Sequence, residues 1–252
     1  MVGQTIRTFA YQPDATTPAD GRVDSSPVTS QTSQKDAKEE WVLVDGTPAS
    51  CVQIGLHHFF QDKGPIDLVI SGPNYGRNTT AVFALSSGTL GAALEAAVCQ
   101  KRSIALSFAF FSRDHDPEII NEACRHSVRV ITALSKQWPE DGRADLYSVN
   151  VPLVKGVESN KTLWTDILKN SWAGGSCFQE IEGTADDENV EEEKIREGSS
   201  TQANDEVAAP SESFTKGSRR FKWAPRFGDI SKTVEDAGPG SDGWAIKEGC
   251  TR

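Results

Sequence analysis

One polar stretch of this sequence carries the side chains best suited to ligand binding. Asn74 and Asn78 offer amide oxygens, which are suitable ligands for a hard metal ion. Arg77 offers a planar cation, and Ser87 and Thr89 offer hydroxyls that can bond an anion. The same residue types are common in solvated turns. The composition of the stretch therefore leaves a ligand site and an ordinary surface loop both open.

The elements around this stretch predict where it lies. Residues 66–71 form a short apolar run rich in branched side chains, which is typical of a buried strand in a parallel sheet. Residues 90–98 carry small, strong helix formers almost all the way round and predict a closely packed, buried helix. Residues 103–108 predict another strand. Strand, helix and strand in this order form a βαβ unit.

The connection between the first strand and the helix is unusually long. About fifteen residues separate the two elements, whereas such connections typically have about 2–6 residues. A loop at the carboxyl end of a parallel strand is where open α/β sheets bind ligands. The free N–H groups at the start of the following helix favour a phosphate. Position and chemistry together indicate an anion or metal site, with a solvated loop as the alternative.

Four short motifs follow one another in a particular order along the chain. They are Gly-Thr-Pro-Ala-Ser-Cys-Val at 46–52, Ser-Gly-Pro-Asn-Tyr-Gly-Arg-Asn at 71–78, Ser-Gly-Thr-Leu-Gly-Ala-Ala at 87–93 and Ser-Val-Asn-Val-Pro at 148–152. In this order they resemble the SurE (survival protein E) family of acid phosphatases and nucleotidases. The resemblance covers roughly residues 41–152, and residues 241–246 are similar to a segment near that family's C-terminus.

The resemblance implies both a fold and a function. The implied fold is α/β, with three layers around a mainly parallel, Rossmann-like sheet. The implied function is metal-dependent hydrolysis of phosphate monoesters, of the 5'/3'-nucleotidase or acid phosphatase type. A nucleoside monophosphate is then the expected substrate, and a homodimer is compatible with the resemblance.

The resemblance also assigns roles to individual residues. Asn74 corresponds to the asparagine that binds the divalent cation, which is Mg²⁺ or Mn²⁺. Ser87, Gly88 and Thr89 correspond to the residues that bind phosphate at the start of the helix. Ser71, Gly72, Gly76 and Asn78 correspond to the residues that support the loop.

The chain departs from the family's pattern at the metal site. In the family, two adjacent aspartates of an N-D-D-G segment and a serine of the next loop also hold the cation, as suits a hard metal ion. Only Asn74 has a counterpart here, and the one Asp-Asp pair, Asp186 and Asp187, follows no strand. We therefore interpret the chain as an incomplete SurE-like domain, which lacks the family's first strand and stops just short of its last. The alternative function is an inactive domain that serves as a binding module, or a fragment of a larger protein with a tubulin-tyrosine-ligase-like domain.

Charge and composition predict the organisation of the rest of the chain. Twelve acidic and two basic residues between 180 and 212 account for the whole net charge of −10. We expect a loop or disordered arm at 1–40, the SurE-like core at 41–181, an acidic disordered insertion at 182–215, and C-terminal strands of the same domain at 216–252. There is no basic stripe and no run of about 18 apolar residues, so neither a nucleic-acid duplex nor a membrane is an expected partner.

Cysteine and histidine positions complete the predictions. The five cysteines form no C-x-x-C pair, which favours buried, reduced thiols in a cytoplasmic protein. Cys51, Cys99 and Cys124 lie within apolar helical patterns. His126 lies off the apolar stripe of a long predicted helix and is expected to be exposed. His115, which stands between two aspartates, offers either a metal ligand or part of a solvated loop.

Overall fold

The structure is a computed structural model of the chain. It describes residues 5–11, 41–111, 116–172, 175–181, 220–225 and 227–252. Most of the predicted arm, the acidic insertion and the loop with His115 lie outside the described residues. The chain divides into two compact units, each treated by itself: Met1–Asn170 with Val234–Arg252, and Ser171–Thr233.

A three-stranded parallel sheet forms the centre of the first unit, with the order β3-β4-β5. The strands are β3 at Leu68–Tyr75, β4 at Arg102–Ala109 and β5 at Leu146–Pro152. Near the carboxyl edge, Ser107 of β4 pairs with Asn74 on one side and Asn150 on the other. β4 is buried from its second residue onward because it is the middle strand. These pairings confirm the predicted parallel sheet.

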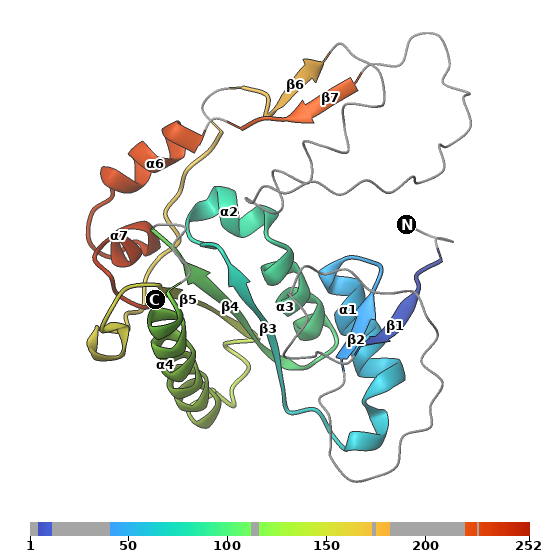
Figure 1. The fold of residues 1–252 in the computed structure, drawn as a ribbon. Coiled ribbons are helices and arrows are strands. Elements are labelled where there is room, and N and C mark those ends of the chain that lie inside the picture. Colours follow the sequence, from blue (N-terminus) through green and yellow to red (C-terminus); the bar gives the residue numbers. More distant parts are fainter. Residues whose placement is uncertain (1–4, 12–40, 112–115, 173–174, 182–219, 226) are drawn as a thin grey trace. The chain divides into compact units, whose positions relative to one another are not determined.

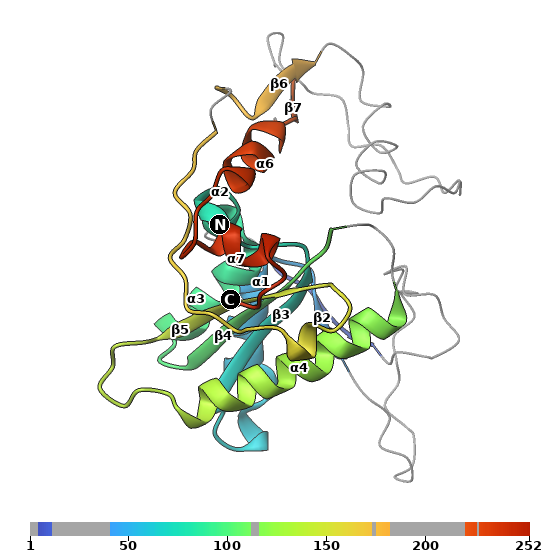
Figure 2. The ribbon, with the colours of Figure 1, turned by 90° about the vertical axis from the view of Figure 1, so that its left-hand side faces the viewer.

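Helices cover both faces of this sheet (Figure 1). α4, at Pro117–Lys136, packs on one face, where Ala123 and Leu134 join the buried core of β4 and β5. Figure 2 shows α4 crossing in front of the strands. α3, at Gly88–Val98, packs on the other face, and α1, at Pro48–Ile54, contacts α3. The order of helix, sheet and helix confirms the predicted three-layer α/β fold.

The remaining elements of the first unit are short. β1, at Thr8–Tyr11, pairs antiparallel with β2, at Trp41–Val44. Helical turns span Gly55–Phe59, Gln61–Lys63 and Val157–Ser159. α7, at Asp242–Lys247, begins at the N-cap Ser241, whose hydroxyl accepts from the Trp244 N–H. α7 brings the last residues of the chain to the edge of β5, where Asn150 and Arg252 exchange backbone hydrogen bonds of 2.9 and 3.1 Å.

The second unit contains an antiparallel strand pair. β6 spans Phe178–Ile181 and β7 spans Arg220–Trp223, which confirms the strand predicted near residues 221–225. The Phe227 ring, at the start of α6 (Phe227–Glu235), contacts the rings of Trp172 and Trp223. These aromatic contacts supply apolar packing for a small unit.

The prediction of one long loop before α3 is wrong in one respect. β3 continues to Tyr75, and a short helix, α2 at Thr80–Ser86, lies inside the stretch. Only residues 76–79 connect the strand to this helix. The first N–H groups of α2 bond to three residues far along the chain, which are Asp242, Leu168 and Asn170. No local start signal therefore marks this helix.

Several predictions of burial are also wrong. α3 is buried on one side only, since its other side turns away from the sheet, and Leu94 and Val98 are exposed. Cys51 and Cys124 are exposed free thiols. Cys51 is exposed because it lines an open hollow between α1 and β3. His126 is buried rather than exposed, because its Nε2 lies 3.0 Å from the Thr251 hydroxyl at the far end of the chain.

By length and apolarity, no single helix among the described residues qualifies as a membrane span. α2 and α3 reach the length and apolarity of a span only when they are taken together, and the chain bends by 61° at the break between them.

Candidate functional site

The end of β3 is shaped by two glycines. A side chain at Gly72 would overlap the Leu106 carbonyl oxygen of β4, and the φ of 127° also favours glycine. Gly76 donates its N–H to the Phe108 carbonyl at 2.9 Å, which ties the strand end to β4. Between them, the amide nitrogen of Asn74 donates to the Gly76 carbonyl at 3.0 Å. The Asn74 side chain is therefore oriented by the turn that carries it.

Asn78 is buried at the centre of a polar network. Its amide nitrogen donates to the Ser107 hydroxyl, and its backbone N–H donates to the Asn150 amide oxygen, both at 2.7 Å. Its carbonyl accepts from the Arg252 guanidinium at 2.8 Å. Asn78 thus joins β4, β5 and the end of the chain. The network fixes the connection between β3 and α2 from three directions.

Asp242 fixes the next part of the connection. This carboxylate is fully buried and accepts from the backbone N–H groups of Thr80 at 2.7 Å and Leu168 at 2.9 Å. The Arg252 guanidinium lies 3.4 Å from the same carboxylate. Thr80 has a positive φ of 67°, which is uncommon for a β-branched residue. The Asp242 contact holds Thr80 in this conformation at the start of α2.

The start of α3 lies at the carboxyl edge of the sheet, because a helix between two parallel strands runs opposite to them. Ser87 is the N-cap, and its hydroxyl accepts from the Leu90 N–H at 3.2 Å. A side chain at Gly88 would come within 2.9 Å of Pro48 Cγ, so Gly88 allows α1 and α3 to begin close together. The N–H groups of Gly88 and Thr89 make no backbone hydrogen bond among the described residues, as is usual in a first helical turn.

Arg77 carries a positive charge in the same connection. It is half-buried, and this desolvation lowers the pKa of Arg77. No ion pair within the described part of the chain includes Arg77. Burial also lowers the pKa of Arg252, but there the Asp242 carboxylate acts in the opposite direction. Among the described residues, Arg77 therefore lacks the counter-charge that Arg252 has, and an anion at this edge would supply it.

The same residues do not make a divalent-cation site by themselves. Mg²⁺ and Mn²⁺ need several oxygen ligands that include carboxylates. The described residues contain no group of three or more His, Cys, Asp or Glu side chains that could hold a metal. Asn74 offers one amide oxygen, and Asp242 is committed to backbone N–H groups and Arg252. The donor set at this edge thus fits an anion better than a divalent cation.

Sequence reasoning placed some of these residues and missed others. As predicted, Asn74, Asn78 and the start of α3 lie at one edge of the sheet. The sequence alone did not indicate that Ser107, Asn150, Asp242 and Arg252 belong to the network. Two of them had a signal, because Asn150 lies in the Ser-Val-Asn-Val-Pro motif and Asp242 lies in the segment similar to the family's C-terminus.

A family model decides the affiliation of the chain. The model described as "Survival protein SurE" matches residues 8–174, which is well over half of the sequence. The chain belongs to the SurE family. This confirms the predicted resemblance and places the chain in a family of nucleotidases and phosphatases.

Three similar proteins show how far the likeness extends. A probable tubulin–tyrosine ligase of Saccharomyces cerevisiae is 36% identical over 193 residues, which are 75% of this chain and 22% of that protein. The 5'-nucleotidase SurE of Ruegeria pomeroyi is 45% identical over 126 residues, 48% of this chain and 46% of that protein. The SurE protein of Aquifex aeolicus shares the fold, with a TM-score of 0.50 and 22% identity over 84% of this chain and 67% of that one. The SurE chain therefore spans less than half the length of these two sequence relatives.

Proposed function

We propose that this SurE chain binds the phosphate group of a phosphate monoester at the carboxyl edge of its sheet. The observation that carries the proposal is Arg77, a half-buried cation with no carboxylate partner among the described residues. The start of α3, with the Ser87 cap and the N–H groups of Gly88 and Thr89, supplies hydrogen-bond donors at the same edge. A cation and a helix start together favour a phosphate dianion.

A nucleoside monophosphate is the proposed substrate. The family affiliation supports this choice, because several relatives are named 5'-nucleotidase. The role of Asn78, Asp242 and Arg252 is to hold the connection that carries Asn74 and Arg77. This role is positional, since each of these groups is engaged by contacts within the protein.

Hydrolysis is the second part of the proposal, and it needs more than these residues. A divalent cation, Mg²⁺ or Mn²⁺, would neutralise charge on the phosphoryl group and lower the pKa of a bound water. Asn74 is the proposed ligand from this chain. The described residues do not supply the carboxylates, so their own contribution is to bind and orient the phosphate. We expect turnover only where such carboxylates are present.

Binding of adenosine monophosphate to the 252-residue chain tests the site. Isothermal titration of the chain and of Arg77→Gln should show affinity at least about tenfold weaker in the variant, since a charge-assisted contact is lost. Arg143→Gln is the matched control, because it removes the same charge from an exposed arginine paired with Asp141 at the amino end of β5. Equal affinity of Arg77→Gln and the unchanged chain would refute the proposed site.

A further inference from the structure

The carboxyl ends of β3 and β4 are neighbours, but the helices that follow them lie on opposite faces of the sheet. α3, which follows β3, packs on the face of Ser103, whose hydroxyl donates to the Ala93 carbonyl at 2.7 Å. α4, which follows β4, packs on the other face, where Ala123 belongs to the same buried cluster as Leu106 and Phe108. Open α/β sheets bind ligands outside the carboxyl ends of strands at such a divergence. A substrate whose phosphate lies at the start of α3 would therefore extend over these two strand ends.

Two aromatic rings stand at these strand ends. Tyr75 is the last residue of β3, and Phe110 directly follows β4. Their rings are stacked, with centroids 4.8 Å apart and planes inclined by only 13°. Tyr75 is nevertheless 40% exposed. Scattered exposed aromatic residues are ordinary on protein surfaces, but this stacked pair lies beside the polar connection that carries Arg77.

The strand register makes the two faces at the end of β3 chemically different. Paired residues of neighbouring strands lie on the same face of a sheet, and successive residues alternate between the faces. Tyr75 pairs with Phe108, a member of the buried cluster beneath α4, so the Tyr75 ring lies on the α4 face. Asn74 pairs with Ser107 and lies on the α3 face. This strand end therefore presents a polar amide toward α3 and an aromatic ring toward α4.

A nucleotide has the same division between a polar and an aromatic end. Its phosphate is charged, and its base has a flat face that stacks on aromatic side chains. With the phosphate at Arg77 and the start of α3, the ribose would cross the end of β3 at Gly76, which follows Tyr75 and adds no side chain there. The base would then reach the Tyr75 ring on the α4 face.

We propose that Tyr75, supported by Phe110, stacks on the base of the nucleotide and makes the site select a nucleoside monophosphate over a phosphate monoester without a base. The inference rests on the phosphate site proposed above and adds a specificity-determining residue to it. The stacking contact with Phe110 orients the Tyr75 ring before the base arrives, so that less side-chain freedom is lost on binding. Removal of an aromatic ring that stacks on a base typically weakens binding by about 5- to 150-fold.

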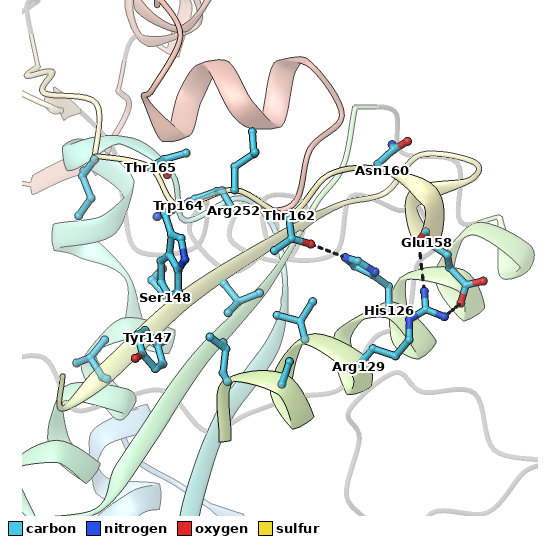
Figure 3. Close-up of a pocket in the computed structure, with 17 residues that line it drawn as sticks. His126, Arg129, Tyr147, Ser148, Glu158, Asn160, Thr162, Trp164, Thr165 and Arg252 are labelled. Atoms are coloured by element: carbon cyan, nitrogen blue, oxygen red, sulfur yellow. Dashed lines mark hydrogen bonds and ion pairs between the residues drawn. The ribbon is translucent and has the colours of Figure 1, made fainter. Parts of the chain in front are cut away.

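A second pair of aromatic rings lies elsewhere in the first unit. Tyr147 and Trp164, with ring centroids 5.5 Å apart, line a cavity of about 620 Å³ between α4, β5 and the segment 160–167 (Figure 3). Tyr147 is the second residue of β5, so it lies roughly 16 Å along the strand from the carboxyl end at Pro152. A base held there is too far from the start of α3 for the phosphate of the same nucleotide to bind at that helix. The exposed Trp164 ring therefore provides a matched control for Tyr75.

NMR titrations with adenosine monophosphate, ribose 5-phosphate and adenosine test the proposal, because these ligands carry both groups, the phosphate alone and the base alone. We expect the unchanged chain to bind adenosine monophosphate at least about tenfold more tightly than ribose 5-phosphate. Tyr75→Leu should lower the first affinity to about the level of the second and leave the second unchanged. Tyr75→Phe keeps the ring and should retain the affinity for adenosine monophosphate. Trp164→Leu should change neither affinity.

The outcomes separate this inference from the phosphate site on which it rests. Equal affinities of the unchanged chain for adenosine monophosphate and ribose 5-phosphate, both weakened by Arg77→Gln, would overturn base stacking and leave the phosphate site intact. Adenosine binding that Tyr75→Leu abolishes, without any binding of ribose 5-phosphate, would support the aromatic contact and refute the phosphate site. Loss of affinity for adenosine monophosphate in Trp164→Leu rather than in Tyr75→Leu would place the base beside β5 and overturn the proposal. Binding of none of the three ligands would overturn both proposals.

Discussion

The guanidinium of Arg252 lies 3.4 Å from the carboxylate of Asp242, and both side chains are buried, with 5% and 0% of their surface exposed. This pair connects the last residue of the chain to α7. Through Thr80 and Asn78 it also reaches the connection that carries the candidate phosphate site.

Asp242→Asn should destabilise the chain strongly. The change leaves the buried Arg252 without its counter-charge and weakens the contacts with Thr80 and Leu168. Loss of one partner of a buried pair typically costs roughly 3–5 kcal/mol, which urea unfolding would measure. The control is Asp141→Asn, which breaks an exposed pair with Arg143 and should change stability little. Similar midpoints for both variants would show that the buried pair does not stabilise the fold.

Stability should fall as the pH drops below about 6.5, the usual pKa of histidine. Burial lowers the pKa of His126, the nearby Arg129 lowers it further, and Glu158 opposes them. The unfolded chain therefore binds more protons than the folded chain between the lowered pKa and 6.5, so the free energy of unfolding decreases as pH falls through this window.

His126→Gln should flatten this pH dependence, because glutamine does not titrate and its amide still reaches hydrogen-bonding distance of Thr251. Unfolding midpoints at pH 7.5, 6.5 and 5.5 provide the measurement. His57→Gln, at an exposed residue, is the control and should keep the slope of the unchanged chain. If His126→Gln kept the pH dependence of stability of the unchanged chain, His126 would not be the group that causes it.

Gly72→Ala should disturb the end of β3. The new methyl group would overlap the Leu106 carbonyl oxygen, and alanine is strained at a φ of 127°. We expect a loss of roughly 3 kcal/mol or more in thermal or urea unfolding, from strain and steric overlap together. Gly142→Ala, at a φ of 73° with open space around it, separates the two effects and should cost about 1–2 kcal/mol. Equal losses would mean that the close approach to β4 is unimportant.

The 252-residue chain with Mg²⁺ or Mn²⁺ should hydrolyse neither a nucleoside monophosphate nor a chromogenic phosphate ester. The described residues offer one amide oxygen, from Asn74, which does not replace the several oxygen ligands and negative charge that a hard cation needs. Release of inorganic phosphate is the measurement. Metal-dependent turnover that co-purifies with the protein and disappears in Asn74→Leu would overturn this expectation. It would also show that carboxylates elsewhere in the chain complete the site.

The parallel sheet and its covering helices were predictable because their signals are local. The branched run of β3 and the long α4, with Asp116 as its cap, read directly as strand and helix. α2 was not predictable in this way, because Asp242, 162 positions further along, satisfies its first N–H. His126 was placed on the wrong side for the same reason, since Thr251 covers it. Long-range contacts decide both cases, and periodicity carries no information about them.

The network around Asn78 and Thr80 has a consequence for how the protein is made. These residues leave the ribosome early, whereas Asp242 and Arg252, which hold them in place, are synthesised 162 and 174 residues after Thr80 and Asn78. The strands can pair while translation continues, but the connection after β3 reaches its final shape only once residues 242–252 have left the ribosome. A chain that is terminated before residue 242 would therefore keep its sheet and lose the fixed geometry of the candidate phosphate site.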